Sequence, residues 1–119
     1  LFYGAHLATR AAHRLVPPRN RDPSRSPEEL LAVASGAAAM LAEVVRAAPA
    51  DARGFHGAGM ADPEGFVAMG CAETLIHADD IARGLGVPFA PPADLAARVA
   101  RRLFPWAPED GAPWQILRW

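Results

Sequence analysis

The positions of proline constrain the fold of this 119-residue chain most, because twelve prolines leave few uninterrupted stretches. A proline inside a helix removes a backbone hydrogen bond and clashes with the preceding turn, so helices have to lie between prolines. Four stretches are long enough and carry apolar residues at helical spacing. We predict helices over residues 1–16, 27–48, 63–83 and 93–104. No stretch alternates like a strand, so the sequence predicts an all-α fold, namely a four-helix bundle.

Two of these helices carry clear start signals. Ser26 can cap the second helix, with Pro27 at its first position and Glu29 completing a capping box. Asp62 can cap the third helix in the same way, again followed by a proline, Pro63. These signals fix where two of the predicted helices begin.

The remaining segments lack helical periodicity. Residues 50–61 contain three glycines, and we predict a loop there. The tail after Pro105 could hold one short helix, and we interpret its tryptophans as packing residues. They are Trp106, Trp114 and Trp119.

The composition indicates one globular domain over residues 1–119, since 51% of the residues are hydrophobic and 21% are charged. A net charge of −1 and the absence of a basic patch argue against a nucleic-acid partner. No apolar run approaches the roughly 18 residues that a membrane span requires, so no membrane partner is expected.

Cys71 is the single cysteine, which excludes an internal disulfide and fits a reducing compartment. We therefore expect a cytoplasmic protein. The sequence begins at Leu1, inside an apolar helical pattern, and we expect it to be a fragment whose N-terminal helix is missing.

Three polar residues in the third predicted helix suggest a metal site. Glu73, His77 and Asp80 fall at helical spacing on a stripe that also holds Phe66 and Ile76, so we expect the stripe to face the core. A buried carboxylate needs a compensating partner, and a divalent cation would supply it. Glu and His one turn apart can bind the same ion, and zinc commonly takes both as ligands. Asp80 could accept the second imidazole N–H and orient the ring. The alternative is a Glu–His pair without a metal.

The segment from Cys71 to Gly86 contains a Glu, a His four residues later and an Asp three further on. An apolar residue, a small residue and a glycine follow. This pattern resembles the metal-binding domain of mycothiol-dependent maleylpyruvate isomerase, in the DinB-like superfamily of helical bundles. The resemblance covers about residues 26–108. It implies a four-helix bundle with zinc held by Glu73, His77 and one His from an earlier helix. The family's enzymes use the thiol cofactor mycothiol.

The third ligand stays open between two alternatives. His6 has the local surroundings of the family's histidine, but the helix after it is shorter than usual, so the ligand could instead lie upstream of Leu1. His56 could contribute to the mouth of a pocket, whereas His13 is more simply a surface histidine. We also predict that Cys71 is a buried, inert thiol.

One further pair is visible in the third predicted helix. Asp79 and Arg83 lie four residues apart, and we expect an exposed ion pair of little energetic value.

The leading hypothesis is a zinc-dependent, mycothiol-type isomerase or S-transferase that acts on a small molecule. The alternatives are a non-catalytic metal-binding or regulatory module and a scaffold without metal. The sequence identifies no catalytic nucleophile or base, which leaves open whether the chain is an enzyme. It leaves the substrate and the oligomeric state open as well.

Overall fold

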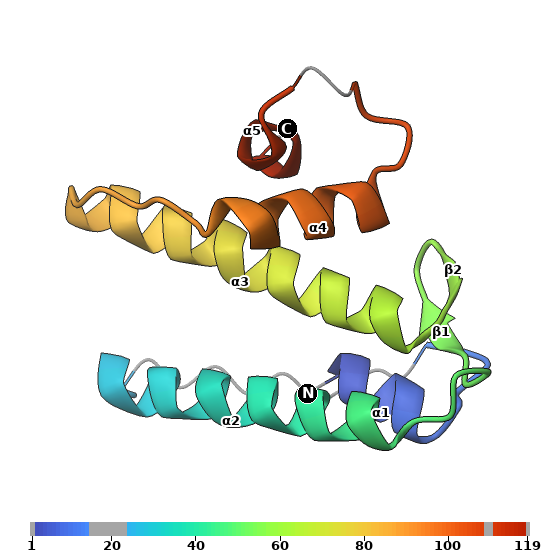
Figure 1. Cartoon of the computed structure of the whole chain (residues 1–119). Coiled ribbons are helices and arrows are strands. Elements are labelled where there is room, and N and C mark those ends of the chain that lie inside the picture. Colours follow the sequence, from blue (N-terminus) through green and yellow to red (C-terminus); the bar gives the residue numbers. More distant parts are fainter. Residues whose placement is uncertain (1, 15–23, 109–110, 119) are drawn as a thin grey trace. The chain divides into compact units, whose positions relative to one another are not determined.

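The computed structural model describes residues 2–14, 24–108 and 111–118, and these residues are mostly helical (Figure 1). They form five helices and one two-stranded antiparallel sheet. The chain divides into two compact units, residues 1–67 and residues 68–119, and each is described by itself. The elements in chain order are α1 (Phe2–Ala8), α2 (Pro27–Ala47), β1 (Gly54–His56), β2 (Gly59–Ala61), α3 (Pro63–Leu85), α4 (Ala93–Leu103) and α5 (Pro113–Arg118).

In the first unit, α1 packs against both α2 and the β1–β2 hairpin. A Cβ atom on Gly4 would lie 3.7 Å from the Cα atom of Leu41, so the backbones of α1 and α2 approach each other closely at Gly4. A Cβ atom on Gly54 would lie only 2.7 Å from the carbonyl oxygen of His6, so this contact with α1 requires glycine. The Phe66 side chain is fully buried in this unit, with its ring 5.9 Å from that of Tyr3.

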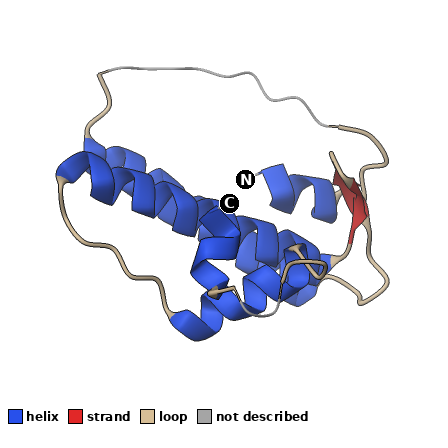
Figure 2. Ribbon diagram, turned by 90° about the horizontal axis from the view of Figure 1, so that it is seen from above, coloured by secondary structure: helices blue, strands red, loops and turns tan. Residues whose placement is uncertain are grey.

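The hairpin lies in the segment that the sequence predicted to be a loop, so that prediction is wrong for the two strands, residues 54–56 and 59–61. Its strands pair Gly54 with Ala61 and His56 with Gly59, and Figure 2 shows them beside α1. Three residues are too few for an alternating pattern to stand out in a sequence. Gly59 has a φ of 130°, a backbone conformation that favours glycine.

The first helix is much shorter than the predicted 1–16, because it closes at Ala8. Arg10 has a φ of 48°, the Ala11 N–H donates to the His6 carbonyl (3.0 Å), and the Arg10 N–H donates to the Leu7 carbonyl (3.2 Å). This is a Schellman ending with arginine in the left-handed position. Residues 15–16 of the prediction lie outside the described residues.

The start and length of α2 confirm the predicted second helix. The Ser26 hydroxyl accepts from the Glu29 N–H (3.2 Å), and the Glu29 carboxylate accepts from the Ser26 N–H (3.0 Å), which is the predicted capping box. No residue of α2 is buried. Among its exposed side chains are those of Leu30, Leu31, Val33 and Met40.

The apolar length of α2 overturns the expectation that no run approaches membrane-spanning length. By length and composition, it is the one helix among the described residues that could cross a membrane, although the core helix of a soluble protein has the same properties. Alanines between the leucines and valines of α2 make its apolar stretch longer than the large apolar side chains alone indicate. The expected absence of a membrane partner stays a prediction.

The second unit is built from most of α3 together with α4 and α5. Its core gathers one face of each helix: Ala72, Leu75, Ala96, Val99, Ala100 and Leu117. The predicted boundaries of α3 and α4 are confirmed to within two residues, and α5 is the short helix expected in the tail. The Asp62 carboxylate accepts from the Gly65 N–H (2.7 Å), as expected for a cap. The start of α3 is therefore fixed as the sequence predicted.

The tryptophans of the tail differ from one another. Trp114 is half-buried, with its ring 5.8 Å from that of Phe89, which confirms its packing role. Trp106 is 76% exposed and contacts the edge of Phe104, so the prediction of a packing residue is wrong there. Trp119 lies outside the described residues.

Candidate metal centre

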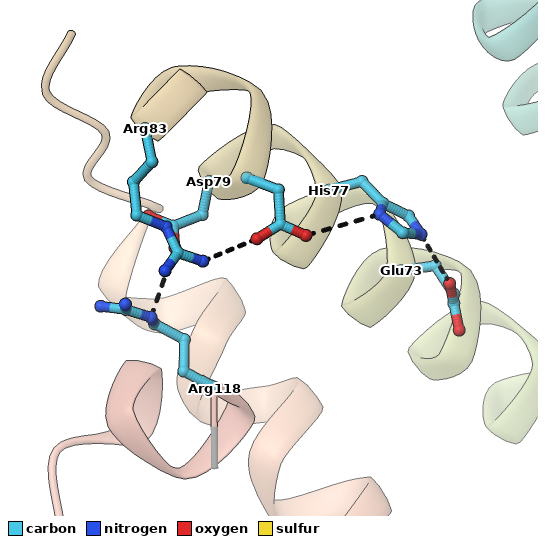
Figure 3. Close-up of polar contacts among 6 residues, drawn as sticks. Glu73, His77, Asp79, Arg83 and Arg118 are labelled. Atoms are coloured by element: carbon cyan, nitrogen blue, oxygen red, sulfur yellow. Dashed lines mark hydrogen bonds and ion pairs between the residues drawn. The ribbon is translucent and has the colours of Figure 1, made fainter. Parts of the chain in front are cut away.

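Glu73 and His77 lie next to each other on α3, one turn apart. The Glu73 Oε2 atom is 3.3 Å from the His77 Nε2 atom. On the other side of the same ring, Nδ1 lies 3.8 Å from the Oδ2 atom of Asp80. The two ring nitrogens therefore face two different carboxylates, as the contacts drawn in Figure 3 show.

The Glu73–His77 spacing suits two ligands of one ion. Donor atoms that bind a tetrahedral zinc at about 2.0–2.2 Å lie about 3.3–3.5 Å from each other. The observed 3.3 Å falls at the short end of that range. The same spacing also suits a simple Glu–His pair without a metal, so the distance fits a metal without requiring one.

The predicted core-facing stripe is wrong for this part of α3. Glu73 and His77 have side chains that are 59% and 68% exposed, so no burial of charge calls for a cation here. The face of α3 that is buried in the second unit is instead marked by small and aliphatic residues and one carboxylate. These are Ala72, Leu75, Asp79 and Ala82. Alanines outline the core face less clearly than larger apolar side chains do.

Asp79 is the buried carboxylate, and its partners come from two helices. Its side chain is 10% exposed, and its Oδ2 atom lies 3.1 Å from Arg83 Nη2 and 3.3 Å from Arg118 Nε. These contacts are ion pairs, since among the described residues Oδ2 has no well-aligned hydrogen bond. The predicted Asp79–Arg83 ion pair is therefore confirmed, but its expected exposure is wrong for Asp79, which is buried and also pairs with Arg118 of α5. Sequence reasoning missed Arg118, which lies 39 residues after Asp79 in a tail without a motif.

Arg83 contacts two carboxylates at once. Its Nη2 atom donates to Asp80 Oδ1 (2.6 Å) and also lies within ion-pair distance of Asp79. A continuous row of polar contacts therefore runs from Glu73 on α3 to Arg118 on α5 (Figure 3).

The other predicted site residues lie in the first unit. His6 is buried on α1, with its ring 6.0 Å from that of Phe55. His56 is half-buried on β1, and its Nδ1 atom accepts from the Ala58 N–H (3.2 Å). Within the described residues, no three His, Cys, Asp or Glu side chains gather closely enough to hold a metal. His6 as the third ligand and His56 as a pocket residue stay predictions.

Cys71 lies on a different side of α3 from the Glu–His pair. It is half-buried and packs against the core of the second unit. Burial raises the pKa of its thiol above the ordinary value of 9.0, and the positive charge of Arg98 opposes this only in part. A raised pKa disfavours the reactive thiolate, which is consistent with an inert thiol, but the predicted full burial is wrong because Cys71 is only half-buried.

Comparisons with known proteins identify no relative of this chain: no family model, curated protein or solved structure matches it.

Proposed function

We propose that this protein is a zinc-binding helical domain with the four-helix topology of the DinB-like bundles, in which Glu73 and His77 bind the ion. The observation that carries the proposal is the 3.3 Å separation of Glu73 Oε2 and His77 Nε2, which suits two vertices of a tetrahedral site. Another divalent metal with similar ligand preferences could replace zinc. The resemblance implies one further His ligand, for which His6 is the candidate in this sequence.

The contacts of His77 support separate roles for its two nitrogens. In a neutral imidazole only one nitrogen carries a proton, so a metal on Nε2 requires the proton on Nδ1. Nδ1 faces Asp80 at 3.8 Å, a distance that a small side-chain rotation would shorten to a hydrogen bond. Asp80 therefore orients the ring rather than binding the metal.

The resemblance to the mycothiol-dependent isomerases extends this proposal to an activity. Zinc would lower the pKa of a bound thiol and so favour its thiolate. The chain would then act as a cytoplasmic, thiol-cofactor-dependent isomerase or S-transferase on a small molecule. A non-catalytic metal-binding module is the alternative, favoured by the exposure of both ligand side chains.

Zinc titration by calorimetry, with elemental analysis of the purified protein, tests the metal site. We expect about one zinc per chain, lost or greatly weakened in His77→Ala and Glu73→Gln, since each change removes one ligand. His13→Ala and Glu64→Gln are matched controls, because each removes an exposed side chain of the same type as one proposed ligand. No stoichiometric zinc, or equal affinities in all four variants, would refute the proposed site.

A second experiment separates the thiol enzyme from the non-catalytic module. Cobalt(II) is substituted for zinc, and mycothiol is added while the visible and near-ultraviolet absorbance is recorded. A new thiolate-to-cobalt band that is absent from His77→Ala supports a metal-bound thiol. Tight metal binding without such a band favours the non-catalytic module.

A further inference from the structure

Arg83 contacts both Asp80, beside the proposed metal site, and Asp79, which is buried in the second unit. We propose that Arg83 is a positioning residue: it holds the Asp80 carboxylate beside His77 and thereby strengthens metal binding. This inference rests on the proposed zinc site. It concerns a residue that contacts neither of the proposed ligands in α3.

The first step of the argument is the anchoring of Arg83. Ion pairs between two fully exposed side chains are usually weak, because both chains stay mobile and water screens their charges. Arg83 also contacts Asp79, whose side chain is 10% exposed. Asp79 is held in turn by Arg118 of α5 at 3.3 Å. Arg83 is therefore tied to a fixed, buried carboxylate.

The second step is the effect on Asp80. The Arg83 Nη2 atom donates to Asp80 Oδ1 at 2.6 Å, while Asp80 Oδ2 lies on the side of His77 Nδ1 at 3.8 Å. One oxygen is thus fixed by the guanidinium and the other is presented to the imidazole. Without Arg83, the Asp80 side chain, more than half exposed, would be free to rotate into solvent. The His77 ring would then lose the carboxylate that orients it.

A zinc competition assay against a chromophoric chelator tests this chain of effects in four proteins. They are the unaltered protein, Asp80→Asn, Arg83→Met and the double variant. Loss of an orienting carboxylate typically lowers metal affinity about 10- to 100-fold, and we expect the zinc affinity of Asp80→Asn to fall by that much. We expect the zinc affinity of Arg83→Met to fall about 3- to 10-fold. In the Asp80→Asn background, Arg83→Met should have no further effect, because Arg83 acts through Asp80.

Arg118→Met is the matched control. The substitution removes a positive charge, as Arg83→Met does. Arg118 also contacts Asp79, but its ion pair does not include Asp80. Removing a positive charge should on its own slightly favour a cation. Arg118→Met also loosens Asp79, which anchors Arg83, but it leaves the Arg83–Asp80 hydrogen bond in place. These two effects oppose each other, so zinc affinity should change less in Arg118→Met than in Arg83→Met, which removes that hydrogen bond.

Arg83→Lys is the second variant, to be used if circular dichroism shows that Arg83→Met does not fold. A lysine keeps the charge but lacks the planar guanidinium, so we expect a smaller loss of about 2- to 3-fold. Unchanged affinity in every soluble Arg83 variant would overturn the inference. An equal loss in the presence and absence of Asp80→Asn would also overturn it. No zinc binding by the unaltered protein would instead overturn the proposed function, and this inference with it.

Discussion

Helices α2 and α4 show that apolar content and burial are separate properties. α2 spans 21 residues and is apolar over most of its length, yet none of its residues is buried. α4 spans only 11 residues and carries several charges, yet it buries Ala96, Val99 and Ala100 against the core of its unit. The charges of α4 define one solvent-facing side and leave a distinct apolar side to pack. α2 has apolar residues around its circumference, so no single side is marked for packing.

The largest effect that separates α2 from the core around α4 should come from side-chain truncation. Leu117 of α5 is 4% exposed in the core shared with α4, and Leu117→Ala should destabilise the fold by about 2–5 kcal/mol through lost burial and a cavity. Leu31 of α2 is 68% exposed, and Leu31→Ala should change stability by less than about 0.5 kcal/mol. Urea unfolding of both variants measures this difference. A large cost for Leu31→Ala would show that the side of α2 that carries Leu31 is packed against another part of the protein.

A smaller effect should appear at the start of α2. Ser26→Ala removes the hydroxyl that accepts from the Glu29 N–H, and we expect a loss of about 1 kcal/mol. Ser35→Ala lies inside the same helix and is the control, because alanine is at least as favourable there as serine. Amide hydrogen exchange of the first turn of α2 should quicken in Ser26→Ala alone. Equal exchange in both variants would argue that the cap contributes little.

The smallest effect concerns Cys71. Its thiol pKa is raised above 9.0 by burial, so the folded state keeps the proton longer than the unfolded state does. The resulting stabilisation is fully present below pH 9.0 and is lost as the pH rises through the folded-state pKa. The thermal unfolding temperature should therefore fall more steeply with rising alkaline pH in the natural protein than in Cys71→Ala. Parallel curves would contradict the assignment.

The predictable parts of the fold were those set by local chemistry. Prolines and caps located α2, α3 and α4, because these signals act over one turn of chain. The same hydrogen-bond pattern ends α1 at Arg10 and α3 at Gly86, yet only the glycine could be anticipated. Arginine rarely adopts a positive φ, so the early end of α1 had no sequence signal.

For the candidate site, too, only the local arrangement along one helix could be predicted. The Glu73–His77–Asp80 spacing correctly placed these three residues on one side of α3. Their exposure, and the burial of Asp79 against Arg118, depend on which elements pack together. That packing joins residues far apart in the chain and leaves no local pattern.

The most direct test of the central claim is a crystal structure of the zinc-bound protein. We expect a zinc ion with a Glu73 oxygen and His77 Nε2 each at about 2.0–2.2 Å, and with Asp80 bonded to Nδ1 instead of the metal. A zinc ion bound elsewhere, or an Asp80 oxygen within about 2.2 Å of it, would contradict the account.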